Sequence, residues 1–210
     1  MLKINQNMIA VIMIGGQSTR MGGGIKSFIE FNNKNIFDRI LERTKPQLNK
    51  IIINCNSPEV KLKKYNITII KDLVDGYLGP LAGIHSAMKW ININEPKIKW
   101  LVTLPGDTPF IPNDLISRFN EKISSKLKIV LAQSDNKTHP TIGAWHTSLF
   151  DSLDEQLNKG MRKILSWAEL HSIDFINYPI INFDPFFNIN TKQDLNMAIK
   201  IEKKFIEKTE

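Results

Sequence analysis

Short apolar runs alternate with longer amphipathic stretches along this chain, and that alternation constrains the fold more than any other feature. An apolar run of strand length followed by a helix-length amphipathic stretch is typical of βα units, whose strands pair in parallel within one sheet. The pattern therefore predicts an α/β fold around a mixed sheet. The predicted strands are Met8–Ile14, Ile51–Cys55, Ile67–Lys71, Trp100–Leu104, Leu127–Gln133, Thr141–Trp145 and Ile173–Ile176.

Helical spacing of apolar side chains fills the intervals between these runs. Thr191 with Asp194 forms a capping-box pattern, which predicts a final helix from about Lys192 to Phe205. The other predicted helices are Ile36 to Leu48 with a break near Pro46, Leu81 to Ile91, Pro112 to Ile123 and Leu149 to Leu157.

The length and composition fit a single globular domain over residues 1–210. A chain of this size can bury a sizeable core, and it contains no repeat, linker or low-complexity tract that would mark a boundary. The only cysteine, Cys55, lies in an apolar run and is predicted to be a buried strand thiol. Met8–Ile14 lacks a following signal-peptide cleavage site, and no apolar stretch reaches the roughly 18 residues of a spanning helix. We therefore expect a cytoplasmic protein with no membrane partner.

The net charge of +7 is compatible with a polyanionic ligand such as a nucleotide, DNA or RNA. However, the lysines are scattered, and the densest run, Lys200 with Lys203 and Lys204, lies on the predicted terminal helix. A solvated helix face explains that run better than a nucleic-acid patch. An RNA-binding function also lacks aromatic residues interleaved in a basic stripe, so no nucleic-acid partner is predicted.

A glycine-rich loop from Gly15 to Lys26 directly follows the first predicted strand. Glycines let backbone N–H groups approach phosphate oxygens closely, and Arg20 and Lys26 add positive charge for a triphosphate. The loop is not a Walker A motif, because Ile25 precedes Lys26, and its glycines do not form the dinucleotide-binding pattern. It therefore predicts a phosphate-binding loop of another kind.

Three polar residues lie at or near the carboxyl ends of successive predicted strands: Asn54, Asp72 and Asp107. Ligands bind at the carboxyl ends of parallel strands, so these side chains are expected to face a common site. Asp107 lies in the turn Pro105-Gly106-Asp107-Thr108-Pro109, which leaves its carboxylate little freedom. Magnesium needs only one or two carboxylates beside phosphate oxygens and waters, so Asp107 is the predicted magnesium ligand.

Several motifs together carry a family resemblance. They are Gly15-Gly16 with Arg20-Met21-Gly22 and Lys26, Gly79-Pro80-Leu81-Ala82-Gly83-Ile84, Gly106-Asp107-Thr108-Pro109-Phe110-Ile111-Pro112, His139-Pro140-Thr141, Gly160 with Arg162, and Phe187-Asn188-Ile189-Asn190-Thr191. The chain resembles the molybdenum cofactor guanylyltransferases over about Ile9 to Leu195. The glycine loop and the Gly-Asp-Thr-Pro turn are shared by many nucleotidyltransferases, whereas the His139-Pro140-Thr141 segment and the Asn188-Ile189-Asn190-Thr191 segment narrow the resemblance to the molybdopterin branch.

The resemblance implies a Rossmann-like three-layer sandwich, with the nucleotide bound by the N-terminal half and the acceptor by the C-terminal half. By matching motif, the GTP-binding residues would be Met13, Ile14, Gly15, Lys26, Asn54, Asp72 and Asp107. By the same matching, His139, Arg162, Asn188 and Asn190 would lie towards molybdopterin. The chain departs from the family pattern with Ile14, where members carry a small residue, and with Ile25, where they carry an acidic one.

The expected reaction transfers GMP from GTP to molybdopterin and releases pyrophosphate. The acceptor phosphate is already an anion near neutral pH, so the protein must mainly bring two anions together and stabilise their charge. Arg20, Lys26 and Asp107 are the predicted catalytic residues, with magnesium on Asp107. Molybdenum cofactor-handling proteins or recipient molybdoenzymes are the expected protein partners.

The sequence is also compatible with other functions. A molybdopterin cytidylyltransferase or a sugar-phosphate nucleotidyltransferase would share the glycine loop, and a nucleotide-sensing module would keep the loop without catalysing transfer. Arg20, Lys26 and Asp107 argue against a pure binder. Trp145 and Trp167 are expected to pack in the core rather than to flank a pterin.

Overall fold

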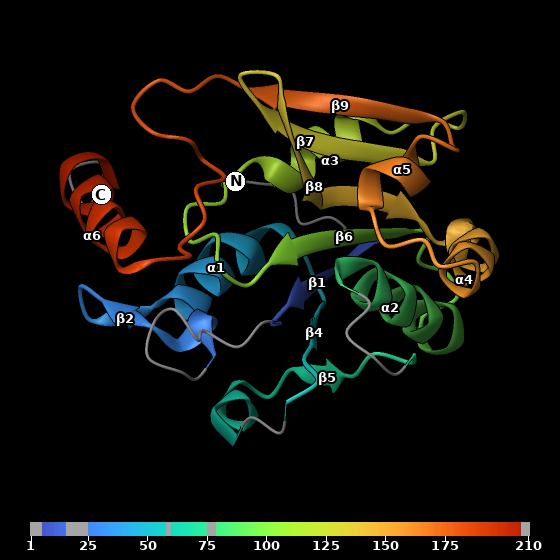
Figure 1. Cartoon of the computed structure of the whole chain (residues 1–210), viewed down its shortest axis with the longest axis horizontal. Coiled ribbons are helices and arrows are strands. Elements are labelled where there is room, and N and C mark those ends of the chain that lie inside the picture. The colour runs from blue at the N-terminus through green and yellow to red at the C-terminus, as the bar shows by residue number, and fades with distance from the viewer. Residues whose placement is uncertain (1–5, 16–24, 58–59, 75–78, 207–210) are drawn as a thin grey trace.

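A seven-stranded sheet crosses the middle of the molecule in the order β5-β4-β1-β6-β8-β7-β9 (Figure 1). The structure is a computed structural model, and it describes residues 6–15, 25–57, 60–74 and 79–206. Among the strands of the described sheet, only β8 runs antiparallel to its neighbours. The strands are β1 (Met8–Met13), β4 (Ile51–Asn54), β5 (Thr68–Ile70), β6 (Trp100–Pro105), β7 (Ile129–Ser134), β8 (Lys137–His146) and β9 (Ile173–Tyr178).

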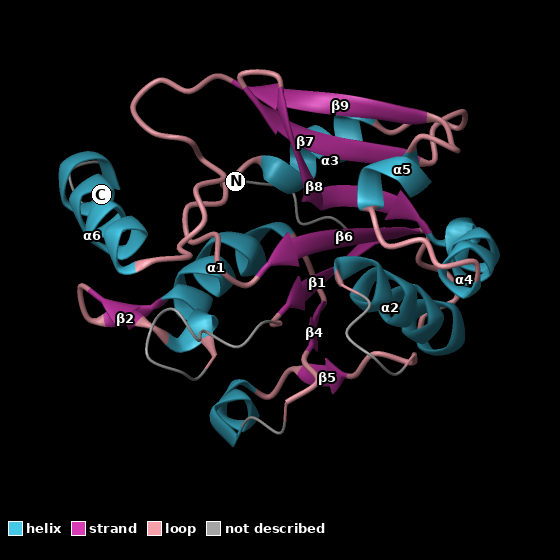
Figure 2. Cartoon of the chain, in the orientation of Figure 1, coloured by secondary structure: helices cyan, strands magenta, loops and turns pink. Residues whose placement is uncertain are grey.

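Helices cover both faces of this sheet (Figure 2). Helices α1 (Ile36–Thr44), α3 (Leu115–Lys122) and α6 (Lys192–Ile201) share one buried cluster, and α2 (Pro80–Asn94), α4 (Phe150–Asn158) and α5 (Ile164–Ala168) share the other. Along β1, Ala10 and Ile12 face the first cluster while Ile9 and Val11 face the second. A strand buried on both faces has to be apolar throughout, which explains the unbroken first run. The predicted α/β three-layer fold with a mostly parallel mixed sheet is confirmed.

All seven predicted strands are present, but β8 begins four residues before the predicted Thr141. This extension includes Pro140, although proline has no N–H for a ladder hydrogen bond. The pairing register between β7 and β8 shifts between Leu131 and Ala132, which moves the partner from Gly143 to His139. Pro140 lies in the skipped stretch, so β8 tolerates a proline where a bulge interrupts its ladder with β7.

The helix predictions need several corrections. The predicted helix from Pro112 begins only at Leu115, because the backbone N–H of Leu115 closes a turn on the Pro112 carbonyl. The final helix keeps its predicted start, with both halves of the Thr191 capping box formed, but it changes after Ile201 into a π-helix over Glu202–Ile206. Helix α5 was not predicted, because five residues are too few to show a helical period.

A two-stranded hairpin also escaped prediction, although the sequence contains its turn signal. Its strands β2 (Glu30–Phe31) and β3 (Lys34–Asn35) are joined by Asn32 and Asn33, which both have positive φ. Asparagine tolerates that conformation, and a two-residue turn with positive φ at both positions matches the twist of a hairpin. The 3-10 helices Lys26–Phe28, Lys45–Gln47, Val60–Tyr65 and Thr147–Leu149 complete the connections.

The predicted core residues lie in the core. Trp145 and Trp167 are fully buried and stack with ring centroids 5.5 Å apart, which confirms packing rather than exposure to a ligand. Cys55 is buried just beyond β4, and its thiol donates to the Ser57 carbonyl at 3.5 Å. In the parts of the chain that the structure describes, no helix is both long and apolar enough to cross a membrane.

Candidate active site

The carboxyl ends of β1, β4, β5 and β6 meet at one edge of the sheet. Met13 at the end of β1 pairs with Asn54 on one side and with Pro105 on the other, and Asn54 pairs in turn with Ile70. The predicted nucleotide-binding residues therefore lie on neighbouring strand ends, as expected for a parallel sheet.

Asp72 is held by two asparagine side chains at this edge. The Asn54 amide donates to Asp72 Oδ1 at 2.9 Å, and the Asn56 amide donates to Asp72 Oδ2 at 2.7 Å. Asn56 also accepts from the Asp72 backbone N–H at 2.8 Å. These bonds fix the orientation of the carboxylate. Asn56 was not predicted for this candidate site, although it lies only two positions after Asn54.

Gly83 lets helix α2 approach this polar pair closely. A Cβ at this position would lie 2.7 Å from Asn54 Oδ1 and 3.3 Å from Met13 Sδ. A contact under 3.0 Å forces a shift, so any larger residue at this position would have to displace the Asn54 side chain. The signal was an isolated glycine within a helical pattern, which often marks a close approach.

Asp107 occupies the turn that follows β6. The N–H of Gly106 donates to the Met13 carbonyl at 3.0 Å, which holds this turn against the end of β1. Asp107 Oδ1 is buried and has no hydrogen-bond partner among the described residues. Burial raises the pKa of Asp107, while the charge of Lys26 opposes that shift.

A divalent cation fits this carboxylate. A buried carboxylate oxygen without a partner is costly, and a cation would satisfy it. Magnesium takes one or two protein carboxylates and completes its shell with phosphate oxygens and waters, so a single aspartate suffices.

Lys26 begins the 3-10 helix Lys26–Phe28 and reaches the C-terminal part of the chain. Its ammonium donates to Asn190 Oδ1 at 2.7 Å, across 164 positions of sequence. The N–H of Ile189 donates to the Asp107 carbonyl at 2.9 Å, and Asn188 lies against the Asp107 side chain. Asn188 and Asn190, which the resemblance placed towards the pterin, thus contact Asp107 and Lys26 of the nucleotide half.

His139 lies at the start of β8, at the same edge of the sheet as the end of β6. Its Nε2 is 2.6 Å from Ser134 Oγ and 3.8 Å from Asp184 Oδ2, and its ring packs on Phe186 at 5.0 Å. Burial lowers the pKa of His139, although the carboxylate of Asp184 opposes this. His139 therefore joins the β7–β8 hairpin to the segment that carries Asn188 and Asn190. Ser134 and Asp184 were not predicted, and no local pattern marks them.

The remaining predicted residues are more scattered. Arg162 lies in the turn between α4 and α5, and its guanidinium donates to the carbonyls of Leu157 and Met161 at 3.1 and 2.7 Å. No hydrogen bond or ion pair joins it to another predicted site residue in the described ranges. Ile14 is buried, with its N–H on the Asn54 carbonyl at 2.8 Å, and Gly15 is exposed beside it. Arg20 and the glycines from Gly16 to Gly24 lie outside the described residues.

A family model described as a MobA-like NTP transferase domain matches residues 10–173. The matched range contains Lys26, Asp72 and Asp107. The chain belongs to this family. The motif-based resemblance is thereby confirmed, and the chain is a nucleotidyltransferase.

Individual relatives agree with this assignment over nearly the full chain. A protein from Nitrobacter hamburgensis named molybdenum cofactor guanylyltransferase is 35% identical over 193 residues, which cover 91% of this chain and 92% of that protein. A protein of the same name from Yersinia pestis is 34% identical, with coverage of 91% and 94%. The crystal structure of molybdopterin-guanine dinucleotide biosynthesis protein A from Archaeoglobus fulgidus has a TM-score of 0.71 at 26% identity, covering 94% of this chain and 100% of that one.

More distant solved structures share the fold alone. The 4-diphosphocytidyl-2C-methyl-D-erythritol synthase from Anaerococcus prevotii has a TM-score of 0.72 at 14% identity, covering 95% of this chain and 97% of that one. A similar fold at this identity carries no argument about the nucleotide or the acceptor.

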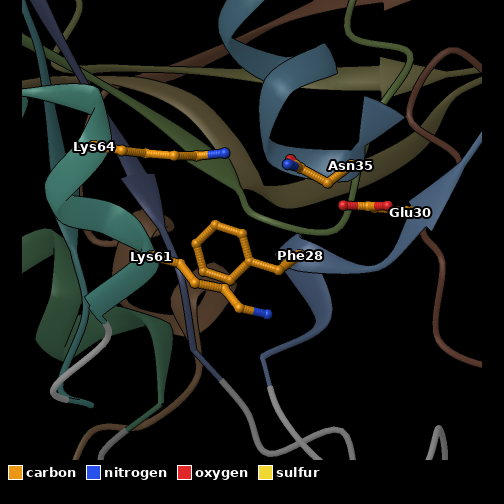
Figure 3. Close-up of a pocket in the computed structure, with 5 residues that line it drawn as sticks. All are labelled: Phe28, Glu30, Asn35, Lys61 and Lys64. Carbon is orange, nitrogen blue, oxygen red and sulfur yellow. The ribbon is translucent and has the colours of Figure 1, made fainter. Parts of the chain in front are cut away.

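This member of the MobA-like family also has a pocket beside the Lys26 segment (Figure 3). Lys61 and Lys64 reach in from the 3-10 helix Val60–Tyr65, and Phe28, Glu30 and Asn35 approach from the other side. The lining combines two cations with a carboxylate, and none of these five residues is a predicted site residue.

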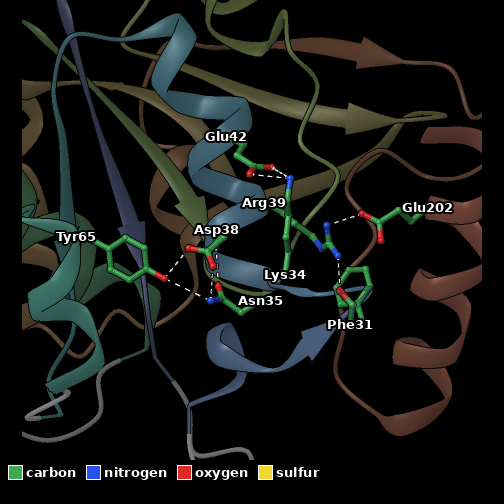
Figure 4. A network of polar contacts seen from close by, with 8 residues as sticks. All are labelled: Phe31, Lys34, Asn35, Asp38, Arg39, Glu42, Tyr65 and Glu202. Atoms are coloured by element: carbon green, nitrogen blue, oxygen red, sulfur yellow. Dashed lines mark hydrogen bonds and ion pairs between the residues drawn. The ribbon is translucent and has the colours of Figure 1, made fainter. Parts of the chain in front are cut away.

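A polar network ties the far end of the C-terminal helix to the same part of the chain (Figure 4). Arg39 on α1 forms a buried ion pair with Glu202 at 2.5 Å, donates to the Phe31 carbonyl and stacks on the Phe31 ring. Asn32 donates to the other oxygen of Glu202 at 2.8 Å. The C-terminal helical segment therefore contacts the N-terminal half through Asn190 before its first turn and through Glu202 just after α6.

Proposed function

We propose that this chain transfers GMP from GTP to molybdopterin, releases pyrophosphate and yields the molybdopterin guanine dinucleotide cofactor, in a reaction that depends on magnesium. The observation that carries the proposal is the meeting of Lys26 and Asp107 with the segment Asn188 to Asn190 at the carboxyl edge of the sheet. The names of the relatives supply the nucleotide and the acceptor.

The polar groups at the ends of β4 and β5 suit a guanine base. Guanine presents a ring N–H and an exocyclic amino group side by side, and a carboxylate accepts hydrogen bonds from two such donors. Asp72 offers a carboxylate that Asn54 and Asn56 hold in place, so it needs little reorganisation to accept from a base. Met13, Ile14 and Gly15 would lie beside the nucleotide at the end of β1.

Lys26 and Asp107 would serve the triphosphate. The acceptor phosphate attacks the α-phosphorus, the bond to the β-phosphate oxygen breaks, and the leaving pyrophosphate takes the electron pair. Lys26 would place its positive charge against the phosphates, and Arg20 would add a second charge. Asp107 would hold magnesium, which supplies electrostatic stabilisation to the phosphate oxygens when bound.

The C-terminal half would bind the acceptor. His139, Arg162, Asn188 and Asn190 are the proposed residues on this side, and residues 1–210 act as one domain with the nucleotide and acceptor halves joined through the sheet. Delivery of the product to molybdenum cofactor-handling proteins or recipient molybdoenzymes, and a cytoplasmic location, stay predictions from the sequence.

Titration calorimetry with GTP, ATP and CTP, each with and without magnesium, tests the nucleotide and the metal. We expect GTP to bind in preference to the others, and Asp107→Ala to lose the magnesium-dependent part of the affinity. Asp151→Ala, which removes an exposed carboxylate on α4, is the matched control. A preference for CTP would contradict the proposal. An affinity for GTP that is unchanged by removal of magnesium and by Asp107→Ala would contradict it as well.

Product formation from GTP and molybdopterin, followed by chromatography, tests the transfer step. Lys26→Ala should lower kcat about a hundredfold, the loss typical of removing one charge-stabilising group, while the far-UV circular dichroism stays unchanged. Lys126→Ala, at an exposed turn, should match the unmodified protein. Full turnover by Lys26→Ala would remove this lysine from the mechanism.

A further inference from the structure

The carboxylate of Asp194 binds two backbone groups at the start of α6, and only one of these contacts belongs to the capping box. Asp194 Oδ2 accepts from the N–H of Thr191 at 2.8 Å, while Thr191 Oγ1 accepts from the N–H of Asp194 at 3.1 Å. This reciprocal pair is the capping box itself. The same oxygen also accepts from the N–H of Asn190 at 2.9 Å, one residue before the cap. Helix capping does not require this extra bond.

The extra bond fixes the residue that holds Lys26. The side chain of Asn190 is exposed and accepts from the Lys26 ammonium at 2.7 Å. The preceding N–H, that of Ile189, is bound to the Asp107 carbonyl. The peptide between Ile189 and Thr191 is thereby anchored on both sides of Asn190, so the amide that faces Lys26 has a defined position.

The electrostatics around Asp194 favour its ionised form, which fits the hydrogen bonds described above. Burial of Asp194 is outweighed by the backbone N–H of Asn190, the hydroxyl and N–H of Thr191 and the charge of Lys26, which together lower its pKa. Asp194 is therefore ionised near neutral pH, and its charge lies close enough to Lys26 to attract the ammonium.

A lysine ammonium is held at one position only when neighbouring groups bind it. Its four-carbon stem is flexible, and its ammonium is a compact charge with no fixed direction. Charge stabilisation in a transferring phosphate depends on placement, and a displacement of about 1 Å costs on the order of a hundredfold in rate.

We propose that Asp194 is a positioning residue of the transfer site, which acts on Lys26 by fixing Asn190. The proposal rests on the function proposed above, because it assumes that Lys26 serves the transferred phosphate. In this proposal Asp194 acts through the backbone of Asn190 and not by contact with the reacting groups.

Two variants separate positioning from helix capping. Asp194→Ala removes both the capping contact and the bond to Asn190, whereas Thr191→Ala removes the other half of the capping box and leaves the bond to Asn190. We expect Asp194→Ala to lower kcat by about tenfold to a hundredfold with KM for GTP changed less than about threefold, and Thr191→Ala to retain kcat within about twofold. Asp194→Asn keeps a carbonyl oxygen for the same N–H, so it should recover most of the loss.

Combination with Lys26→Ala tests the route of action. If Asp194 acts through Lys26, Asp194→Ala should lower kcat much less in the Lys26→Ala background than in the unmodified protein. Equal effects in both backgrounds, or equal losses in the Asp194→Ala and Thr191→Ala variants, would overturn the proposal.

A chemical readout does not depend on activity. The rate at which acetic anhydride modifies Lys26, followed by mass spectrometry, should rise several-fold in Asp194→Ala and stay unchanged in Thr191→Ala. If the unmodified protein forms no dinucleotide product, the proposed function fails, and this rate still decides whether Asp194 holds Lys26. An unchanged rate in Asp194→Ala would refute the positioning role in either case.

Discussion

Loss of Glu202 should destabilise the protein more than loss of any surface acid. The side chains of Arg39 and Glu202 are only 7% and 9% exposed, so replacement of Glu202 leaves a buried guanidinium without its carboxylate. Removing one partner of a buried ion pair costs about 3 to 5 kcal/mol, because the remaining charge stays desolvated. Glu202→Leu isolates this effect, since leucine fills a similar volume.

The size of this loss can be set against the whole stability. Domains typically unfold at a cost of about 5 to 15 kcal/mol, so Glu202→Leu removes a large share. For a chain of this length, each kcal/mol shifts Tm by about 2 to 4 °C, which gives an expected fall of about 10 °C. Urea denaturation and thermal unfolding followed by circular dichroism measure both quantities.

Two further variants make the test decisive. Glu155→Ala breaks the Lys159–Glu155 pair, whose side chains are both 62% exposed, and should change the unfolding free energy by less than about 0.5 kcal/mol. Arg39→Met combined with Glu202→Leu removes both buried charges and should restore stability to within about 1 kcal/mol of the unmodified protein. A loss below about 1 kcal/mol for Glu202→Leu, or a double variant as unstable as the single one, would refute the reasoning.

Two other changes follow from the site. Asp107→Asn should abolish transfer yet raise the unfolding free energy by about 1 kcal/mol at neutral pH, a gain typical of relieving a strained functional site. Because burial raises the pKa of Asp107, the folded protein holds this proton to higher pH than the unfolded chain does, so the stability that this carboxyl group contributes is fully present below the unfolded pKa and is lost as pH rises through the folded pKa. The stability difference between Asp107→Asn and the unmodified protein should therefore grow as pH rises through that pKa, and denaturation without magnesium or nucleotide across that range checks the sign. Gly83→Ala would place a Cβ 2.7 Å from Asn54 Oδ1 and pull Asn54 from Asp72, so KM for GTP should rise about tenfold with little change in kcat. An unchanged KM would show that Asn54 adapts without cost.

The sequence predicts best what depends on local pattern. The apolar run of β1 and the capping box of Thr191 and Asp194 both appear where they were predicted, because periodicity and capping involve residues that are near in sequence. The structure extends β8 back past Pro140, and the bulge that tolerates this proline exists only through pairing with β7. Five-residue α5 carries no period of its own and is held by Trp167 packing on Trp145.

Local sequence patterns do not predict most contacts between segments that are distant in the chain. The strand order brings Asn54, Asp72 and Asp107 to one edge, and the general behaviour of parallel sheets was enough to expect it. The bond from Lys26 to Asn190 and the pairing of His139 with Asp184 depend instead on how the chain returns after β9. No residue type or spacing near Lys26 indicates which distant side chain accepts its hydrogen bond.

The separation of Lys26 from Asn190 also has a consequence for the order of events during synthesis. Ribosomes add about 5 to 20 residues per second, so the 164 positions between these residues correspond to roughly 10 to 30 seconds of translation. Strands β1, β4, β5 and β6 leave the ribosome long before α6 and can pair with one another first. A nascent chain can therefore pair these four strands while Lys26 still lacks Asn190, and the buried cluster under α1 is complete only when Phe186 to Ile201 have been made.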